Sequence, residues 1–383
     1  MPKILKKYYK ILPLLILLII ATAVFIYNIS KKNPYLSDSL FYKHYFYEMQ
    51  GNTFDEARQR VLANHQINWE DNIQKRLIQD EKLYKNSYTF FKKRPLYPLV
   101  ALTFYSIIKN EYLSFAIPIL LAYLASIILA YYFFNLRLGL NYSILATGLL
   151  IAFPPFYIWS TYFMTDVIGL LFWLVNLLLA YKYLISKNKK WLVFFAFTLL
   201  LSLINREQGI LMLPLFAILA VLIRKFKLPK NIIHSNNKLV LICTSFLLLY
   251  LAIIYLTKQK TAWDTLVYYQ NYWGTLNKVY TPEETLLFLG NSIINEHKDF
   301  IQAVINHYWI SLLLIIAIFE AIRTFISKGR NLIDIIMISS GLASYLAIFI
   351  YPSFAFRYFF PTTITILYFS AKFFQNYFEK EKI

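Results

Sequence analysis

Two aspartates and two arginines have side chains that could do chemistry in this chain. Asp38, Asp166, Arg206 and Arg357 all fall at, or just beyond, the same side of a stack of hydrophobic segments. Carboxylates and guanidiniums that converge at one bilayer face can serve a reaction in which an acid-base group activates a hydroxyl while cations stabilise a departing phosphate. Arginine suits phosphate because its planar fork donates two parallel hydrogen bonds.

Each of the four residues also has a simpler structural interpretation. Asp38 and Asp166 could be helix N-caps, where aspartate is favoured. Arg206 and Glu207 lie at the tip of a hairpin with short arms and could pair with structural partners, although ionisable groups at membrane depth are by default functional candidates. Arg357 could be an interfacial arginine that extends toward water. We favour the functional interpretation because the four residues are expected to converge.

The composition is that of an integral membrane protein. Hydrophobic residues make up 58% of the 383 residues, mean hydropathy is +0.49, and apolar runs occupy 11–27, 115–134 and 237–256. The first run is too long for a cleaved signal peptide and is expected to be a retained helix. The net charge of +19 resides in short loops between apolar segments, so it indicates membrane orientation and no nucleic-acid partner.

The sequence indicates neither a metal nor another cofactor. The single cysteine, Cys243, lies inside an apolar run, which excludes a disulfide framework and a thiolate metal site and favours packing. No cluster of histidine, cysteine and carboxylate residues has the spacing of metal ligands.

The apolar periodicity predicts an all-α polytopic membrane protein with about ten transmembrane helices, extracytoplasmic surface helices and a single domain spanning 1–383. A crossing needs ~20 apolar residues. The expected spans are about 11–28, 113–134, 139–156, 165–185, 191–205, 209–223, 238–257, 302–323, 332–351 and 355–376.

The apolar segment 95–108 decides the topology. It offers only about 14 residues, roughly 21 Å against a ~30 Å hydrocarbon core. If it does not cross, the basic loops all face one side, which is then the cytoplasm. Those loops contain Lys3, Lys6, Lys7, Lys10, Arg137, Lys187, Lys189, Lys190, Arg224, Lys225, Lys227, Lys230, Arg323, Lys328 and Arg330. We therefore predict a half-embedded helix at the outer surface, and a multi-pass protein of the cell membrane whose site is extracytoplasmic.

Two long extracytoplasmic loops, 28–112 and 258–301, hold most of the polar sequence. Thr53 and Thr281 each begin a capping box, in which a threonine hydroxyl and a glutamate three residues later satisfy each other's backbone donors. We expect a surface helix after each threonine, the second stopping near Gly290.

The order of these features resembles the GT-C glycosyltransferases, in particular the branch of protein O-mannosyltransferases and lipid A aminoarabinose transferases. The resemblance rests on Asp38 early in a long outer loop, Arg-Pro-Leu-Tyr-Pro at 94–98, a Thr-Asp pair ending at Asp166, an arginine in a short hairpin, and Arg-Tyr before the last helix. It implies a polyprenyl-phosphate sugar donor and a site on the extracytoplasmic face.

By the same resemblance, Asp38 matches the catalytic base and Asp166 the acidic residue of the second loop, while Arg206 and Arg357 lie where the family places donor-phosphate contacts. Many relatives have two adjacent acids in the first loop, whereas Ser39 follows Asp38 here, which argues against a metal-dependent reaction. Further candidates are Arg94 and Lys43 for the donor phosphate, and Tyr42, Tyr97, Glu207 and Tyr358 as supporting residues. Lys43 and the adjacent His44 could instead be solvated loop residues.

Three functions remain open. The leading one is transfer of a sugar from a polyprenyl-phosphate donor to a hydroxyl of a lipid, glycan or protein acceptor, with inversion. The second is a non-enzymatic flippase or transporter of lipid-linked glycans, although transporters commonly show two related halves and none is visible here. The third is a glycan polymerase or ligase, against which only the position of Asp38 argues.

Overall fold

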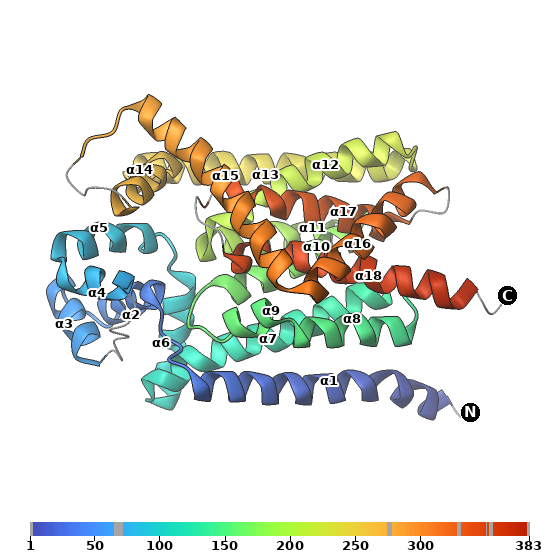
Figure 1. Ribbon diagram of the computed structural model, residues 1–383, viewed down its shortest axis with the longest axis horizontal. Coiled ribbons are helices and arrows are strands. Elements are labelled where there is room, and N and C mark those ends of the chain that lie inside the picture. Colours follow the sequence, from blue (N-terminus) through green and yellow to red (C-terminus); the bar gives the residue numbers. More distant parts are fainter. Residues whose placement is uncertain are drawn as a thin grey trace.

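The computed structural model describes residues 3–64, 72–273, 278–327, 331–349, 351 and 355–380. Every regular element in these ranges is a helix, as the sequence predicts. Long helices run side by side, with both chain ends at one end of the bundle and a group of shorter helices at the other (Figure 1). The described part of the chain is therefore an all-α polytopic membrane protein.

Within the described ranges, seven helical segments are long and apolar enough to cross a membrane. They are Ile11–Lys31 within α1 (Lys3–Lys31), α7 (Glu111–Asn135), α10 (Asp166–Ser186), Glu207–Lys225 comprising η1 (Glu207–Leu211) and α12 (Met212–Lys225), α13 (Lys230–Leu256), α16 (Tyr308–Ile326), and Leu332–Phe349 comprising α17 (Leu332–Tyr345) and η2 (Leu346–Phe349). All seven overlap predicted spans.

The other predicted spans are shorter, broken or more polar. The prediction of one helix over 139–156 was wrong, because α8 (Leu140–Ala152) ends before the proline pair that starts α9 (Pro154–Trp159). The residue before a proline is pushed out of helical conformation, and Phe153 is extended. The predicted span 191–205 corresponds to α11 (Lys189–Asn205). The predicted span 355–376 corresponds to η3 (Phe356–Phe359) followed by α18 (Phe360–Lys380). The total number of crossings stays a prediction.

In the described residues of the two long loops, seven segments are helical. They are α2 (Ser37–Met49), α3 (Phe54–Asn64), α4 (Asn72–Gln79), α5 (Glu81–Phe91), α6 (Leu96–Ile108), α14 (Ala262–Trp273) and α15 (Pro282–Asn306). Both predicted capping boxes are confirmed: the Thr53 and Thr281 amides donate to Glu56 and Glu284 at 2.8 and 2.9 Å, and each glutamate amide donates back to the threonine hydroxyl. The predicted stop near Gly290 was wrong. An interior glycine weakens a helix by only ~1 kcal/mol, and here the helix continues.

Helix α10 packs inside the bundle, where it contacts α7, α11, α13 and α18. One face buries Val167, Leu170 and Trp173, which fixes the helix in the bundle. Its 21 residues extend ~31 Å at 1.5 Å per residue, so its first residue, Asp166, and the basic loop after Ser186 lie at opposite ends of the bundle.

The short helix α6 has 13 residues and ends at Lys109, whose φ of 55° is left-handed. It contacts α2 and α7. Its position relative to a membrane stays a prediction. Of the basic residues used to orient the chain, Lys328 and Arg330 lie outside the described residues, as do the side chains of Lys3, Lys6, Lys7 and Lys10.

Candidate active site

Asp38 is held in the first turn of α2. It is the second helical residue and Leu36 is the N-cap, so the N-cap interpretation of Asp38 was wrong. The next residue, Ser39, is buried and its hydroxyl donates to the Phe163 carbonyl at 3.0 Å, while the Leu36 amide donates to the Ser39 hydroxyl at 3.1 Å. Ser39 therefore ties the start of α2 to the loop that precedes α10.

Asp166 is the first residue of α10, and its N-cap is Thr165, so the N-cap interpretation was wrong here too. Its buried carboxylate accepts a charge-assisted hydrogen bond from Arg206 Nη1, and its other oxygen lies 3.5 Å from Arg357 Nη1. A buried carboxylate is stable only when cations and donors replace its lost water. Asp166 thus fixes the relative positions of two guanidiniums.

Arg206 occupies the turn between α11 and η1 in extended conformation. Its Nε donates to the Tyr351 hydroxyl at 3.0 Å, and its guanidinium lies over the rings of Tyr351 and Tyr358, 4.8 and 5.1 Å from their centroids. The turn is tight: a Cβ added to Gly209 would lie 2.8 Å from the Ser202 hydroxyl. The rings and the carboxylate hold the guanidinium in one orientation.

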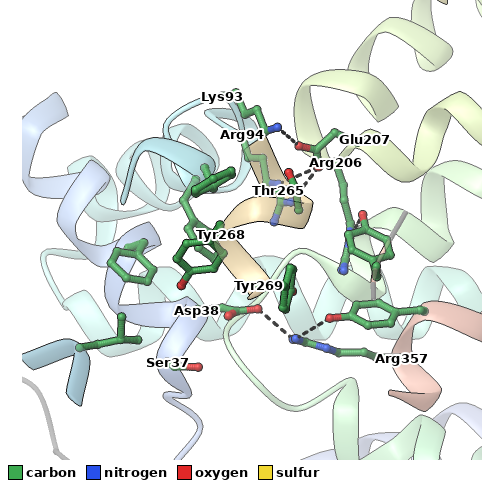
Figure 2. Close-up of a pocket in the computed structure, with 16 residues that line it drawn as sticks. Ser37, Asp38, Lys93, Arg94, Arg206, Glu207, Thr265, Tyr268, Tyr269 and Arg357 are labelled. Atoms are coloured by element: carbon green, nitrogen blue, oxygen red, sulfur yellow. Dashed lines mark hydrogen bonds and ion pairs between the residues drawn. The ribbon is translucent and has the colours of Figure 1, made fainter. Parts of the chain in front are cut away.

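Arg357 points inward from η3, so the interpretation as an arginine extending to the membrane surface was wrong. Its Nη1 lies 3.1 Å from Asp38 Oδ2, and its Nη2 donates to the Tyr358 hydroxyl at 3.1 Å. Its Nε is buried and has no hydrogen-bond partner in the described part of the chain. Arg357 joins Asp38 to Asp166, so the structure brings the four predicted residues into one ion-pair network. Figure 2 shows the pair of Asp38 and Arg357.

A second ion-pair group borders the first. Glu207 accepts from Lys93 Nζ at 2.5 Å and from Arg94 Nη2 at 2.8 Å, and Arg94 Nη1 is 3.5 Å from the Tyr42 hydroxyl. These contacts attach the segment between α5 and α6 to the hairpin that carries Arg206. Figure 2 shows Lys93, Arg94 and Glu207 across the cavity from Asp38 and Arg357.

A cavity of about 190 Å³ lies among these groups. The predicted site residues that line it are Asp38, Arg94, Arg206, Glu207, Arg357 and Tyr358. Four other predicted residues are not among its lining residues: Asp166, Tyr42, Tyr97 and Lys43. Three guanidiniums and a lysine therefore surround the cavity with two carboxylates, which leaves its wall net positive.

The four residues behind the wall have internal contacts. Lys43 lies 2.6 Å from Glu111, Tyr97 donates to the Phe115 carbonyl at 3.0 Å, and Tyr42 shares a 3.0 Å hydrogen bond with Thr165. The interpretation of Lys43 and His44 as solvated loop residues was wrong, because both are buried.

The sequence analysis missed the wall that α14 supplies. Thr265, Tyr268 and Tyr269 line the cavity, although they belong to the second long loop. The Tyr268 hydroxyl lies 2.9 Å from the Ser87 hydroxyl of α5. Burial raises the pKa of Tyr268 to about 12, so its hydroxyl stays protonated at neutral pH. The only sequence signal was an aromatic pair in a polar loop, which is inconspicuous in a chain with 32 tyrosines.

Across the described residues, no group of three or more histidine, cysteine, aspartate and glutamate side chains is arranged to hold a metal ion.

Residues 92–250 match the model of the dolichyl-phosphate-mannose-protein mannosyltransferase family, a domain of the GT-C superfamily. This match confirms the resemblance to GT-C enzymes and covers Arg94, Asp166 and Arg206. Asp38 and Arg357 lie outside it. No curated protein matches the chain in sequence.

Proposed function

We propose that this chain is a membrane glycosyltransferase of the GT-C type, which moves a sugar from a polyprenyl-phosphate donor to an acceptor hydroxyl and inverts the anomeric carbon. One observation carries the proposal: the Asp38 carboxylate pairs with Arg357 in the wall of a cavity that Arg94 and Arg206 also line. One cavity thus holds a carboxylate that can accept a proton from a hydroxyl and guanidiniums that can bind a phosphate. A flippase needs no such base.

The donor phosphate is assigned to the arginines. Guanidiniums bind phosphate through paired, charge-assisted hydrogen bonds. Arg357 is suited because its Nε has no partner, and Arg206 because two tyrosine rings hold its plane. Arg94 lies on the far wall, where Glu207 fixes it. Together they would also stabilise the polyprenyl phosphate as it leaves.

The polyprenyl chain is assigned to a neighbouring apolar cavity of about 250 Å³. Its lining includes Leu200, Leu203 and Ile204 of α11 and Phe246, Leu249 and Ile253 of α13. Both helices carry apolar side chains at membrane depth, and Lys93 lines this cavity as well as the charged one. A lipid phosphate could therefore keep its hydrocarbon chain in an apolar environment while its head reaches the arginines.

Asp38 is the proposed base. The acceptor oxygen attacks the anomeric carbon from the face opposite the phosphate, its proton passes to Asp38, and the bond from the anomeric carbon to the phosphate oxygen breaks. The polyprenyl phosphate keeps that electron pair and leaves as an anion. Arg357 lies 3.1 Å from Asp38, so a phosphate that draws Arg357 toward itself would free the carboxylate to accept a proton.

Asp166 is a positioning residue in this mechanism. It does not line the cavity, and it contacts Arg206 and Arg357 instead. Its charge orients two cations that would otherwise repel each other.

The proposed function can be tested with purified protein in liposomes, labelled polyprenyl-phosphate sugars and a set of hydroxyl acceptors. We expect acceptor-dependent release of polyprenyl phosphate and a product of inverted anomeric configuration. Asp55→Asn, which changes an exposed acid on α3, is the control and should keep activity. Transbilayer movement of intact lipid-linked sugar without bond cleavage would contradict the proposal and favour a flippase.

We also place the cavity on the extracytoplasmic side of the cell membrane. The basic loop at Lys189 lies at the opposite end of α10 from the site, which supports this orientation. In intact cells, a membrane-impermeant thiol reagent should label Asp38→Cys and spare Lys189→Cys. Labelling of both positions from one side would refute the topology.

A further inference from the structure

A second, larger cavity adjoins the charged one. It has a volume of about 620 Å³ and lies between α5 and α14, within the ~300–1,000 Å³ range typical of ligand sites. Tyr268 lines both cavities. The charged cavity thus has an apolar neighbour on its Lys93 side and a polar neighbour on its Tyr268 side.

The polar cavity has a positive wall. Lys82, Lys85 and Lys260 line it, against a single carboxylate, Asp80. The Asp80 carboxylate is already engaged as the N-cap of α5, where it accepts from the Leu83 amide at 2.9 Å. The lining therefore attracts an anionic ligand, and its one carboxylate is already hydrogen-bonded to the backbone of α5.

The remaining polar groups suit hydroxyls. Asn86, Thr89 and Asn271 line the cavity, and amide and hydroxyl groups both donate and accept hydrogen bonds. The side-chain oxygen of Asn271 is buried and has no hydrogen-bond partner in the described ranges. A buried acceptor without a donor is unfavourable, and a ligand hydroxyl would supply the missing hydrogen bond. These groups favour a saccharide over a peptide.

The path to the reacting atoms passes Tyr268. Its hydroxyl is held by Ser87 of α5, so the ring stands between the two cavities. Figure 2 shows Tyr268 on the Asp38 side and Lys93 with Glu207 on the far side. A ligand in the polar cavity therefore approaches the carboxylate, while a lipid in the apolar cavity approaches the arginines.

We propose that the cavity between α5 and α14 binds the acceptor and that this acceptor is an acidic saccharide. The inference rests on the proposed transferase function. It adds the chemical class of the acceptor and assigns Lys82, Lys85, Lys260 and Asn271 to its binding.

A single engineered thiol tests the electrostatics without knowledge of the natural acceptor. Asn86→Cys places it in the cavity, and the native Cys243 is buried. For each variant of the whole chain, the labelling rate with an anionic methanethiosulfonate is divided by the rate with a cationic one. This ratio should be higher for Asn86→Cys than for Gln59→Cys. Gln59 lines a separate cavity with one glutamate and one arginine. Adding Lys82→Gln should lower the ratio roughly 1.5- to 5-fold, the range of a surface charge contact. A ratio equal to that of the control would overturn the assignment.

Protection of the same thiol tests the ligand class. Trigalacturonate should slow labelling of Asn86→Cys, and the neutral maltotriose should do so much less. Triglutamate, with carboxylates but no sugar hydroxyls, is the peptide arm. Equal protection by maltotriose overturns the anionic class, and stronger protection by triglutamate overturns the saccharide. Lys260→Gln should weaken trigalacturonate protection, whereas Lys75→Gln on α4, which does not line the cavity, should leave it unchanged.

Failure of this inference is distinguishable from failure of the proposed function. If no polyprenyl-phosphate sugar is consumed with any acceptor, the transferase function fails whatever the thiol experiments give. If sugar is transferred, Lys82→Gln and Lys260→Gln should raise KM for an acidic acceptor more than for a neutral one. Equal KM changes for both acceptors would overturn the acceptor site and leave the transferase intact.

Discussion

The two ends of the bundle each carry a cluster of paired charges, and the clusters differ in how enclosed their acids are. The site cluster comprises Asp38, Asp166, Arg206 and Arg357. The distal cluster lies where α16, α17 and α18 meet near the carboxyl end of the chain (Figure 1). Its members are Arg137, Glu320, Arg323, Asp334, Tyr368 and Lys372.

In the distal cluster the central acid is fully enclosed. Asp334 Oδ1 accepts from Lys372 and from Tyr368, both at 2.6 Å, and Oδ2 accepts from the Asn331 amide at 3.0 Å. Asp38 instead has a side chain that is 28% exposed and lines a cavity, and its partner Arg357 has an unpartnered Nε. Charges whose bonds are satisfied internally stabilise the fold, whereas charges that keep open donors and a cavity can bind a ligand.

The largest expected effect concerns the base. Asp38→Asn keeps the shape of the side chain and removes its basicity, so turnover should fall ~10²–10⁴-fold, the usual contribution of a positioned acid-base group. Donor affinity and thermal stability should stay near normal. Turnover of purified protein with saturating donor is the measurement. Wild-type turnover in Asp38→Asn would remove the base from the site and favour the flippase.

The distal cluster should respond in the opposite way. Asp334→Asn leaves the Lys372 ammonium buried without its counterion, a change that costs ~3–5 kcal/mol of stability. Unfolding in detergent should therefore occur at a lower temperature, while turnover per folded molecule is kept. Asp334→Leu combined with Lys372→Met should recover much of the loss, because both charges then leave together. A loss of turnover without a loss of stability would erase the contrast between the two clusters.

A smaller effect is expected at the phosphate contacts. A hydrogen bond to a charged group is worth ~1.5–3 kcal/mol, so Arg206→Ala and Arg357→Ala should each weaken donor binding by about 10- to 150-fold. Arg206→Lys keeps the charge, loses the planar fork and should remain impaired. Arg323→Lys in the distal cluster is the matched control, and donor binding should not change there. Unaltered donor affinity in both alanine variants would contradict the assignment.

The positions of the helices could be predicted from the sequence better than the points at which helices end. Apolar runs locate α7 and α10 within a few residues because ~20 apolar residues have few alternatives to a crossing helix. Local signals misled at two points: Pro154 ends α8 inside a run that still reads as apolar, and Gly290 does not end α15. The proline pair is a local signal that ends α8, whereas nothing local shows that α15 continues past Gly290.

The site was only partly predictable for a related reason. Isolated charges beside apolar segments marked Asp38, Asp166, Arg206 and Arg357, because charges next to apolar helices are costly and few. The wall from α14 depends on a contact between residues 181 positions apart, Ser87 and Tyr268, which no local pattern encodes. Lys43 was assigned to phosphate because it follows Asp38 closely, yet five positions along the helix its side chain lies on another face and contacts Glu111.

The smallest expected effect comes from another buried acid, Glu296 of α15, which has no ion-pair partner among the described residues, unlike Asp38 and Asp334. Neither carboxyl oxygen has a hydrogen-bond partner in the described part of the chain. Burial raises the pKa of Glu296 to about 8, and the nearby Asp299 adds to the rise. The folded state therefore holds this proton more tightly than the unfolded state, so stability falls as pH rises from about 4.5 to about 8.

Glu296→Gln should remove that dependence, since glutamine stays neutral. Thermal unfolding in detergent should give wild-type and Glu296→Gln curves that separate as pH rises from 5 to 8, with the variant more stable at pH 8. Glu283→Gln, an exposed acid in the first turn of the same helix, should follow the wild type. Curves for Glu296→Gln and wild type that stay parallel over this range would mean that Glu296 is ionised in the fold. A buried acid without a cation would then be no different from the paired acids at the two ends of the bundle.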